Sequence, residues 1–196
     1  MHDPRSIPGY THGSAARSPI TPDALAAMKA SVLFGEDDVR WLRESRALVG
    51  DRVEAILDVW YGFVGSQPHL LDSFVDVRTK APDAAYLGAV RRRFGQWILD
   101  TADARYDQAW LDYQHEIGLR HHRMKKNATD GAHAAPIVPF RHLFLLAYPI
   151  TATLRPFLEA GGHAAADVDR MQQAWLKSVL LQCTLWSHGY VKDGDF

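Results

Sequence analysis

Two adjacent histidines, His121 and His122, stand near the end of a segment whose apolar residues recur at helical spacing. Residues three or four apart share one face of a helix. The largely apolar stripe on this face consists of Trp110, Tyr113, Ile117, His121 and Met124. The spacing therefore predicts that His121 faces the interior, whereas His122 lies on a flank that leads to the basic end of the segment.

An inward imidazole is either a core histidine whose polar atoms are satisfied locally or a ligand whose ring nitrogen points at a metal. The core interpretation is the more common one, because one histidine is not a metal site and no second ligand stands at the required spacing. Haem needs only one protein ligand, since its four pyrrole nitrogens already fill the equatorial plane. On the histidine alone, both interpretations stay open.

The composition allows one domain of ordinary size that can enclose a cofactor. The chain has 196 residues, of which 47% are hydrophobic, and its formal net charge of -1 gives no basic field that would favour nucleic acid. No apolar run approaches the roughly 20 residues of a membrane span, so we expect no membrane partner. The single cysteine, Cys183, and an N-terminus without the apolar core of a signal peptide lead us to expect a cytoplasmic protein.

The periodicity predicts an all-α fold, because no segment alternates with the period of a strand. Residues 1–20 are rich in Pro, Gly and Ser and should form an irregular arm, followed by one domain over 21–196. The first helix should be capped by Thr21. Further elements are expected from about 36, over 50–66, 68–74, 86–98, 106–127, 138–158 and 165–190. The penultimate helix should bend or break around Pro149.

Several short blocks occur in a fixed order along almost the whole chain. They are IPGY at 7–10, WYGFVG at 60–65, RF at 93–94, WILDT at 97–101, WLDYQ at 110–114, GLRHHR at 118–123, YPITAT at 148–153 and YVK at 190–192. Together they make the sequence similar to the protoglobins. The resemblance implies a globin fold extended by an N-terminal arm and an extra leading helix. It also implies one b-type haem held through the first histidine of the pair, here His121, with the arm covering the haem.

The resemblance further implies a distal pocket for small ligands. Tyr61 resembles the family's distal tyrosine, a hydrogen-bond donor that can stabilise bound dioxygen in a dry pocket. Trp60 lies beside it in the sequence, and Phe94 on the facing helix should close the pocket. By spacing alone, these three residues would be core aromatics.

Other haem contacts are expected around the rim and edge of the same pocket. They are Phe74, the counterpart of a phenylalanine near the haem edge, together with Ile117, Leu146, Ile150 and, for the propionates, Arg93 and Tyr113. Leu146 replaces a phenylalanine of the family, so the distal cavity should be wider. The alternative for Arg93 is membership of a solvated basic run over 91–93, on the outer side of its helix.

The resemblance implies reversible binding of dioxygen, carbon monoxide and nitric oxide, in a carrier, scavenger or sensor. A haem enzyme that detoxifies reactive nitrogen or oxygen species, by nitric oxide dioxygenation or by peroxynitrite or nitrite chemistry, is the alternative. The expected distal residues offer it neither a histidine nor an arginine for acid-base work. A helical interaction module without cofactor is the third possibility. A homodimer through the last two helices is also expected, with Trp175 and Trp186 either at its surface or buried within each monomer.

Overall fold

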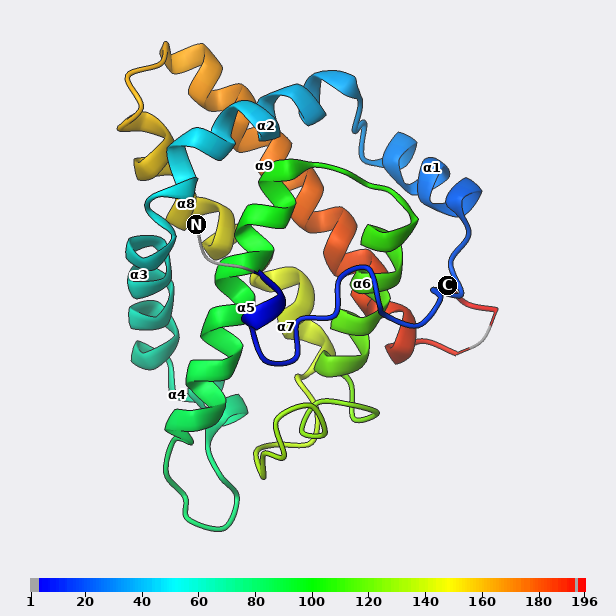
Figure 1. Ribbon diagram of the computed structural model, residues 1–196, viewed down its shortest axis with the longest axis vertical. Coiled ribbons are helices and arrows are strands. Elements are labelled where there is room, and N and C mark those ends of the chain that lie inside the picture. Colours follow the sequence, from blue (N-terminus) through cyan, green and yellow to red (C-terminus); the bar gives the residue numbers. More distant parts are fainter. Residues whose placement is uncertain (1–3, 193) are drawn as a thin grey trace.

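The computed structural model describes residues 4–192 and 194–196, and these residues build a helical protein (Figure 1). The α-helices are α1 (Pro22–Ser31), α2 (Glu36–Gly50), α3 (Val53–Ser66), α4 (Pro68–Leu71), α5 (Ala84–Asp103), α6 (Gln108–His121), α7 (Phe140–Leu145), α8 (Ala147–Glu159) and α9 (Ala165–Ser187). Short 3-10 helices cover η1 (Pro4–Ser6), η2 (Asp72–Phe74) and η3 (His188–Tyr190).

The all-α prediction is confirmed. Within the described residues, β structure is limited to one isolated antiparallel bridge between Val75 and Pro82. None of the helices in this part of the chain has the length and apolar character needed to span a bilayer. Residues 1–3 of the expected N-terminal arm lie outside the described residues.

Side-chain caps fix where several helices begin. The Thr21 hydroxyl accepts a hydrogen bond from the Ala24 amide at 3.1 Å, as the sequence predicted for the start of α1. The helix with the paired histidines begins later than expected. Tyr106 has a left-handed backbone with φ of 48°, and Asp107 caps the helix by accepting from the Trp110 amide at 2.9 Å.

The same helix also ends earlier than the periodicity predicted, at His121. The next residue, His122, has an extended backbone with ψ of 158°, so the helical stripe stops there. The expectation that Met124 shares the inward face is therefore wrong, and its side chain is 65% exposed. Residues beyond His122 instead turn back, with the amide of Lys126 donating to the His122 carbonyl.

The predicted break around Pro149 is confirmed and separates α7 from α8. Leu146 lies between the two helices, with φ of -77° and ψ of -9°. Proline lacks an amide hydrogen, and its ring collides with the carbonyl four residues earlier, which here belongs to Leu145. The chain therefore departs from the regular helix at Leu146, and Pro149 lies in the first turn of α8.

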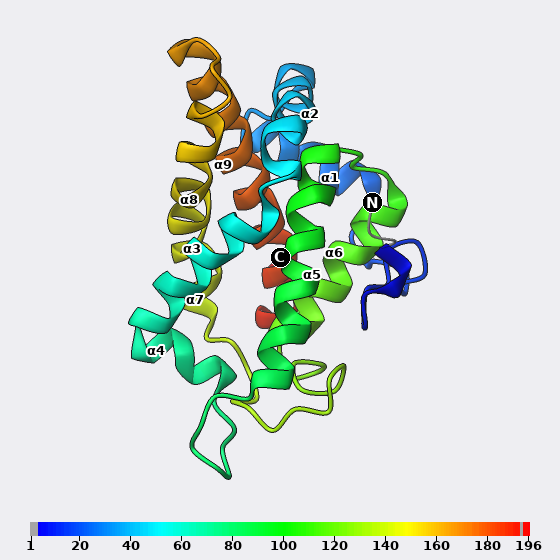
Figure 2. The same ribbon diagram turned by 60° about the vertical axis from the view of Figure 1, so that its left-hand side comes forward.

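Helix α9 forms the centre of the core and packs on α2, α6, α7 and α8. Figure 2 shows α8 and α9 side by side along one edge of the molecule. Buried indole groups donate hydrogen bonds between neighbouring helices at 2.6 to 2.9 Å, which removes the cost of burying a polar N–H. The pairs are Trp175 with Ser45 on α2, Trp97 on α5 with Gln182, and Trp186 with Gln114 on α6.

These bonds settle one expectation about the last helices. Trp175 is fully buried and Trp186 is 7% exposed, so both belong to the core of the monomer. They do not supply a surface for a second copy of the chain.

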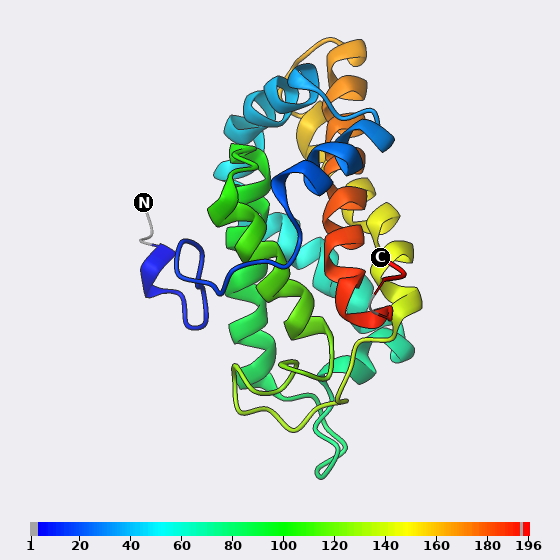
Figure 3. The same cartoon turned by 90° about the vertical axis from the view of Figure 1, so that its right-hand side faces the viewer.

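The N-terminal arm packs against α5 and α6 (Figure 3). Ile7 is buried, and the Tyr10 hydroxyl donates to the Asp100 carboxylate at 2.8 Å. Further along, the Ser18 amide donates to Asp112 at 2.8 Å. The arm is thus held by specific polar contacts as well as by apolar packing.

A glycine allows α6 and α9 to approach closely just before the paired histidines. A Cβ added at Gly118 would lie 2.9 Å from the Trp186 Cα and 3.0 Å from its carbonyl oxygen. Both are backbone atoms, so they cannot rotate away. This contact brings the next turn of α6, which carries His121, against the Trp186 indole.

We expect Gly118→Ala to destabilise the protein by about 1 to 3 kcal/mol, because the new methyl forces the two helices apart. The measurement is chemical unfolding of the two proteins. Gly62→Ala on α3 is the matched control, since no atom lies within 4 Å of its added Cβ. It should raise stability by about 0.5 to 1 kcal/mol through helix propensity. Equal effects of the two substitutions would contradict the close approach of α6 and α9.

Candidate functional site

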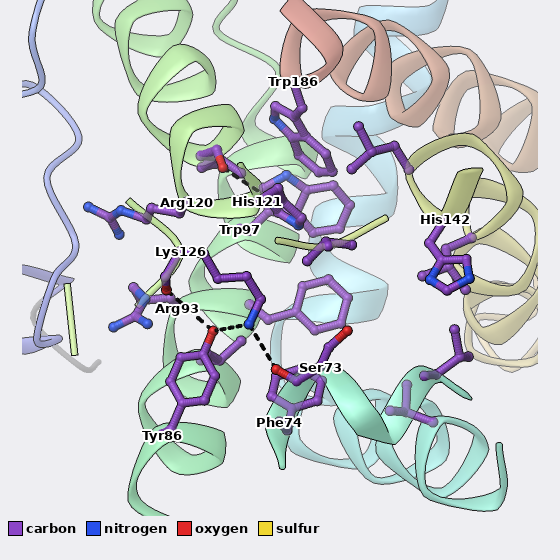
Figure 4. A pocket seen from close by; sticks show the side chains of 18 of the residues that line it. Ser73, Phe74, Tyr86, Arg93, Trp97, Arg120, His121, Lys126, His142 and Trp186 are labelled. Atoms are coloured by element: carbon purple, nitrogen blue, oxygen red, sulfur yellow. Dashed lines mark hydrogen bonds between the residues drawn. The ribbon is translucent and has the colours of Figure 1, made fainter. Parts of the chain in front are cut away.

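A cavity of about 230 Å³ opens between α3, α5, α6 and the α7–α8 corner (Figure 4). Its far end is lined by Ser73 and Phe74 of η2 and by residues of the loop over 122–139, which lies at one end of the molecule in Figures 1 and 2. All ten side chains that the sequence proposed for a site line this cavity. They are Trp60, Tyr61, Phe74, Arg93, Phe94, Tyr113, Ile117, His121, Leu146 and Ile150.

His121 presents an unprotonated ring nitrogen to the cavity. Its Nδ1 lies 2.9 Å from the Ile117 carbonyl oxygen, which can only accept, so Nδ1 carries the proton and Nε2 keeps its lone pair. Burial lowers the pKa of His121, and the nearby Lys126 and Arg120 add to this, against the opposing effect of the hydrogen bond to Ile117. The imidazole is therefore neutral at physiological pH.

Helix packing fixes the orientation of that imidazole. The His121 ring stacks on the Trp186 indole, with centroids 5.1 Å apart and planes inclined by 9°. The indole is held in turn by its hydrogen bond to Gln114. His122 is not part of the cavity wall and packs its ring edge to face with Tyr190 at 5.0 Å. The predicted division between an inward and an outward histidine is confirmed.

The opposite wall is aromatic. Trp60 meets Phe94 edge to face at 5.8 Å, and Tyr61 meets both Phe74 and Phe94 at 6.4 Å. Burial raises the pKa of the Tyr61 hydroxyl, so the group stays protonated. No described residue accepts a hydrogen bond from it. The wall thus offers an O–H donor within apolar surroundings.

Arg93 belongs to the cavity wall and not to a solvated face, so that alternative is wrong for this residue. Its guanidinium donates to both carboxylate oxygens of Asp130 and, at 2.9 Å, to the Pro8 carbonyl of the arm. The Arg93 and Asp130 side chains are only 10% and 11% exposed. Arg92 is exposed, and Arg91 pairs with acidic residues of α3. The basic run over 91–93 is therefore divided between surface and cavity.

Tyr113 lies beside this basic region. Its side chain is buried, its ring meets Tyr10 of the arm edge to face at 5.1 Å, and burial raises its pKa to about 12. The hydroxyl is thus an uncharged donor near the place where the arm covers the cavity.

Sequence reasoning missed three basic side chains of the wall, Arg120, Lys126 and His142. Lys126 was hidden in a basic run that looked like the solvated end of a helix, and Arg120 in the same run forms an ion pair with Glu116 at 3.0 Å. His142 was not proposed, although it stands four residues before Leu146, a spacing that would have placed it on the cavity face. Arg120 and Lys126 had no comparable spacing in the sequence that would have placed them in the cavity wall.

The chain matches known proteins along most of its length. The model of the family described as Protoglobin matches residues 21–196. The globin domain of a globin-coupled sensor from Geobacter sulfurreducens is similar in structure, with a TM-score of 0.61 at 12% sequence identity. The match covers 85% of this chain and 97% of that domain. No curated protein matches. At this identity the structural likeness shows the fold, and the predicted globin fold is confirmed.

His142 is expected to reduce stability in acid. Burial lowers its pKa, with further lowering by Arg141 and by His69, whose ring lies 5.7 Å away. A histidine with a lower pKa in the folded than in the unfolded protein takes up its proton preferentially on unfolding. Its stabilising contribution is therefore complete above about pH 6.5 and is lost as the pH falls toward the folded-state value.

The wild-type protein should have a smaller free energy of unfolding at about pH 5.5 than at about pH 7.5, and we expect this difference to be smaller in His142→Leu. Urea unfolding without added ligand measures it. The neighbouring cavity residue supplies the control. Leu143→Val should lower stability at both pH values while keeping the wild-type difference. If His142→Leu kept that difference as well, the assignment of a desolvated, neutral imidazole would be wrong.

Proposed function

Because the chain belongs to the protoglobin family, we propose that it binds one b-type haem in this cavity through His121 and reversibly takes up dioxygen, carbon monoxide and nitric oxide. The observation that carries the proposal is the neutral imidazole of His121. Its Nδ1 proton is fixed on the Ile117 carbonyl, which leaves the Nε2 lone pair for a metal. We propose a role as carrier, scavenger or sensor in the cytoplasm.

The residues around the cavity fit this group chemically. One nitrogen donor suffices for a metal that already has four equatorial ligands. The aromatic wall of Trp60, Tyr61, Phe74 and Phe94 suits a flat apolar macrocycle, and basic side chains at one end suit its carboxylates. The cavity therefore matches an amphiphilic ligand with an apolar body and an anionic edge.

The chain's own residues prepare the remaining side of the pocket. When bound, a ferrous haem with one protein ligand supplies an open coordination position for a diatomic molecule. Trp60, Phe94, Leu146 and Ile150 exclude water from that side. The Tyr61 hydroxyl is protonated and has no acceptor among the described residues. It would donate to a small ligand that acquires negative charge, and a dry environment would strengthen such a bond.

A haem enzyme that detoxifies reactive nitrogen or oxygen species is the second candidate, and His142 is the observation in its favour. This neutral imidazole in the cavity wall can act as a general base or acid. Stopped-flow mixing of the oxygenated protein with nitric oxide, with and without a reductase, separates the two functions. Repeated turnover supports catalysis, and a single stoichiometric reaction supports binding.

The expected homodimer through the last two helices stays a prediction that the mass in solution would test. Leu145 and Tyr148 lie on the segment predicted as the penultimate helix, over 138–158, are 68% and 75% exposed, and are the large side chains we propose for this contact.

We expect the purified protein to show a haem Soret band that collapses in His121→Ala, because the variant lacks the nitrogen donor. Added imidazole should restore it by filling the space left by the side chain. His122→Ala is the matched control and should keep the wild-type spectrum, since its ring lies outside the cavity. A colourless wild-type protein after expression with ample haem supply would refute the proposed function.

Tyr61→Phe should raise the dioxygen dissociation rate roughly five- to thirtyfold, the equivalent of one lost hydrogen bond of about 1 to 2 kcal/mol. Flash photolysis or stopped-flow displacement by carbon monoxide measures the rate. Tyr113→Phe, which removes a different cavity hydroxyl, close to the N-terminal arm, should leave the rate close to the wild-type value. An unchanged rate in Tyr61→Phe would exclude this hydroxyl as the stabilising donor.

A further inference from the structure

Lys126 places a buried cation in the cavity wall. The residue is 4% exposed, and its Nζ donates to the Ser73 carbonyl at 2.8 Å and to the Tyr86 hydroxyl at 3.2 Å (Figure 4). Both acceptors are uncharged. An ammonium group has three N–H donors, so one of them is left for another partner. Burial lowers the pKa of Lys126 to about 8, which still leaves the amine largely protonated at neutral pH.

The two other cations of the wall already have carboxylate partners. Arg93 is paired with Asp130, and Arg120 is paired with Glu116. Both pairs are nearly buried, and Glu116 also pairs with Lys125, whose side chain is 43% exposed. In residues 4–192 and 194–196, by contrast, no carboxylate forms an ion pair with Lys126. Of these three cations, Lys126 is the one whose charge the described protein leaves uncompensated.

An uncompensated buried charge is costly, because the interior replaces water poorly as a solvent for ions. An anion that enters the cavity removes this cost and gains a charge-assisted hydrogen bond. The lining of the cavity as a whole is mostly apolar. The ligand that satisfies both conditions has an apolar body and a carboxylate at the end where Lys126 lies.

We propose that Lys126 binds a carboxylate of the molecule held in the cavity and is the main anion-binding residue of the site. The inference rests on the proposed function, in which the carboxylates are the two propionates of the haem. Figure 4 shows Lys126 on the side of the cavity that carries Arg93 and Arg120, across from His142. The propionate edge of the ligand is thereby assigned to this basic side.

This assignment changes the role expected for Arg93. Its charge is already matched by Asp130, and three of its N–H groups donate to Asp130 and to the Pro8 carbonyl, whereas Lys126 has no carboxylate partner among the described residues. Arg93 therefore acts mainly by holding the arm and the loop that contains Asp130, and Lys126 makes the direct charge contact.

A binding cycle with two porphyrins tests the proposal. Iron protoporphyrin IX carries two carboxylates, which its dimethyl ester replaces with uncharged methyl esters that accept hydrogen bonds more weakly. Dissociation of each from the full-length wild type, Lys126→Met and Lys125→Met is followed by transfer to an excess of a competing apoglobin. Lys125 is the matched control, because its side chain is 43% exposed and already pairs with Glu116.

We expect wild type and Lys125→Met to bind the diacid more tightly than the diester. Lys126→Met should reduce this ratio of affinities by roughly ten- to a hundredfold, which corresponds to the usual free energy of a hydrogen bond to a charged group. Lys126→Arg should keep much of it. A wild-type preference in Lys126→Met would overturn the inference while leaving haem binding intact. Failure of wild type to bind either porphyrin would overturn the proposed function and the inference together.

A purely structural role for Lys126 gives a different result. If its contacts with Ser73 and Tyr86 served only to fasten η2 to α5, Lys126→Met would unfold more easily without any porphyrin and would show the wild-type preference with it. We expect instead that the porphyrin-free Lys126→Met protein is at least as stable as wild type, because the substitution removes a buried unpaired charge. Thermal unfolding of the porphyrin-free proteins measures this directly.

Discussion

The hydrogen bond between His121 Nδ1 and the Ile117 carbonyl is the interaction on which the chemistry of the cavity depends. It joins two residues one turn apart on the same helix, so α6 alone determines which ring nitrogen carries the proton. Which way the other nitrogen points is a tertiary matter. The Trp186 indole that stacks on the ring comes from α9, and it reaches this position only because Gly118 lets the two helices meet at backbone distance. Tautomer and direction thus have separate physical origins.

The end of α6 directly after His121 also determines where the positive charge of Lys126 lies. A helix continued through residues 122–126 would carry Lys126 about 140° around the helix axis from His121 and so away from the cavity. Instead the chain turns at His122. Backbone hydrogen bonds from Lys125 to Leu119 and from Lys126 to His122 bring Lys126 back to the cavity wall. The His121 imidazole and the Lys126 ammonium group therefore lie five residues apart in the sequence and face the same cavity from different segments.

The sequence predicts well whatever depends on local periodicity. The helical class, the cap at Thr21, the break before Pro149 and the inward face of His121 follow from spacing and from the chemistry of single residues. The ten cavity side chains needed the family resemblance as well, since spacing alone made Trp60, Tyr61 and Phe94 ordinary core aromatics. The sequence did not predict features that depend on partners far away in the chain. The carboxylate of Arg93 lies 37 residues away, and Lys126 turns inward only because α6 ends early.

The N-terminal arm both covers the cavity and holds the charged side chains of its basic side. The Pro8 carbonyl accepts from Arg93, and the Thr11 hydroxyl accepts from Arg120 at 3.2 Å, so the arm contacts both arginines of the basic side. Gly9 stands between these contacts with φ of 76°, and an added Cβ would lie 2.7 Å from Thr129 Cγ2 and 2.9 Å from Arg93 Nη1. Only glycine meets both the left-handed backbone and the close approach. The arm covers the basic side of the cavity while Arg93 is paired with Asp130 and Arg120 is paired with Glu116. Lys126 is then the cation that remains available to bind an anion in the cavity.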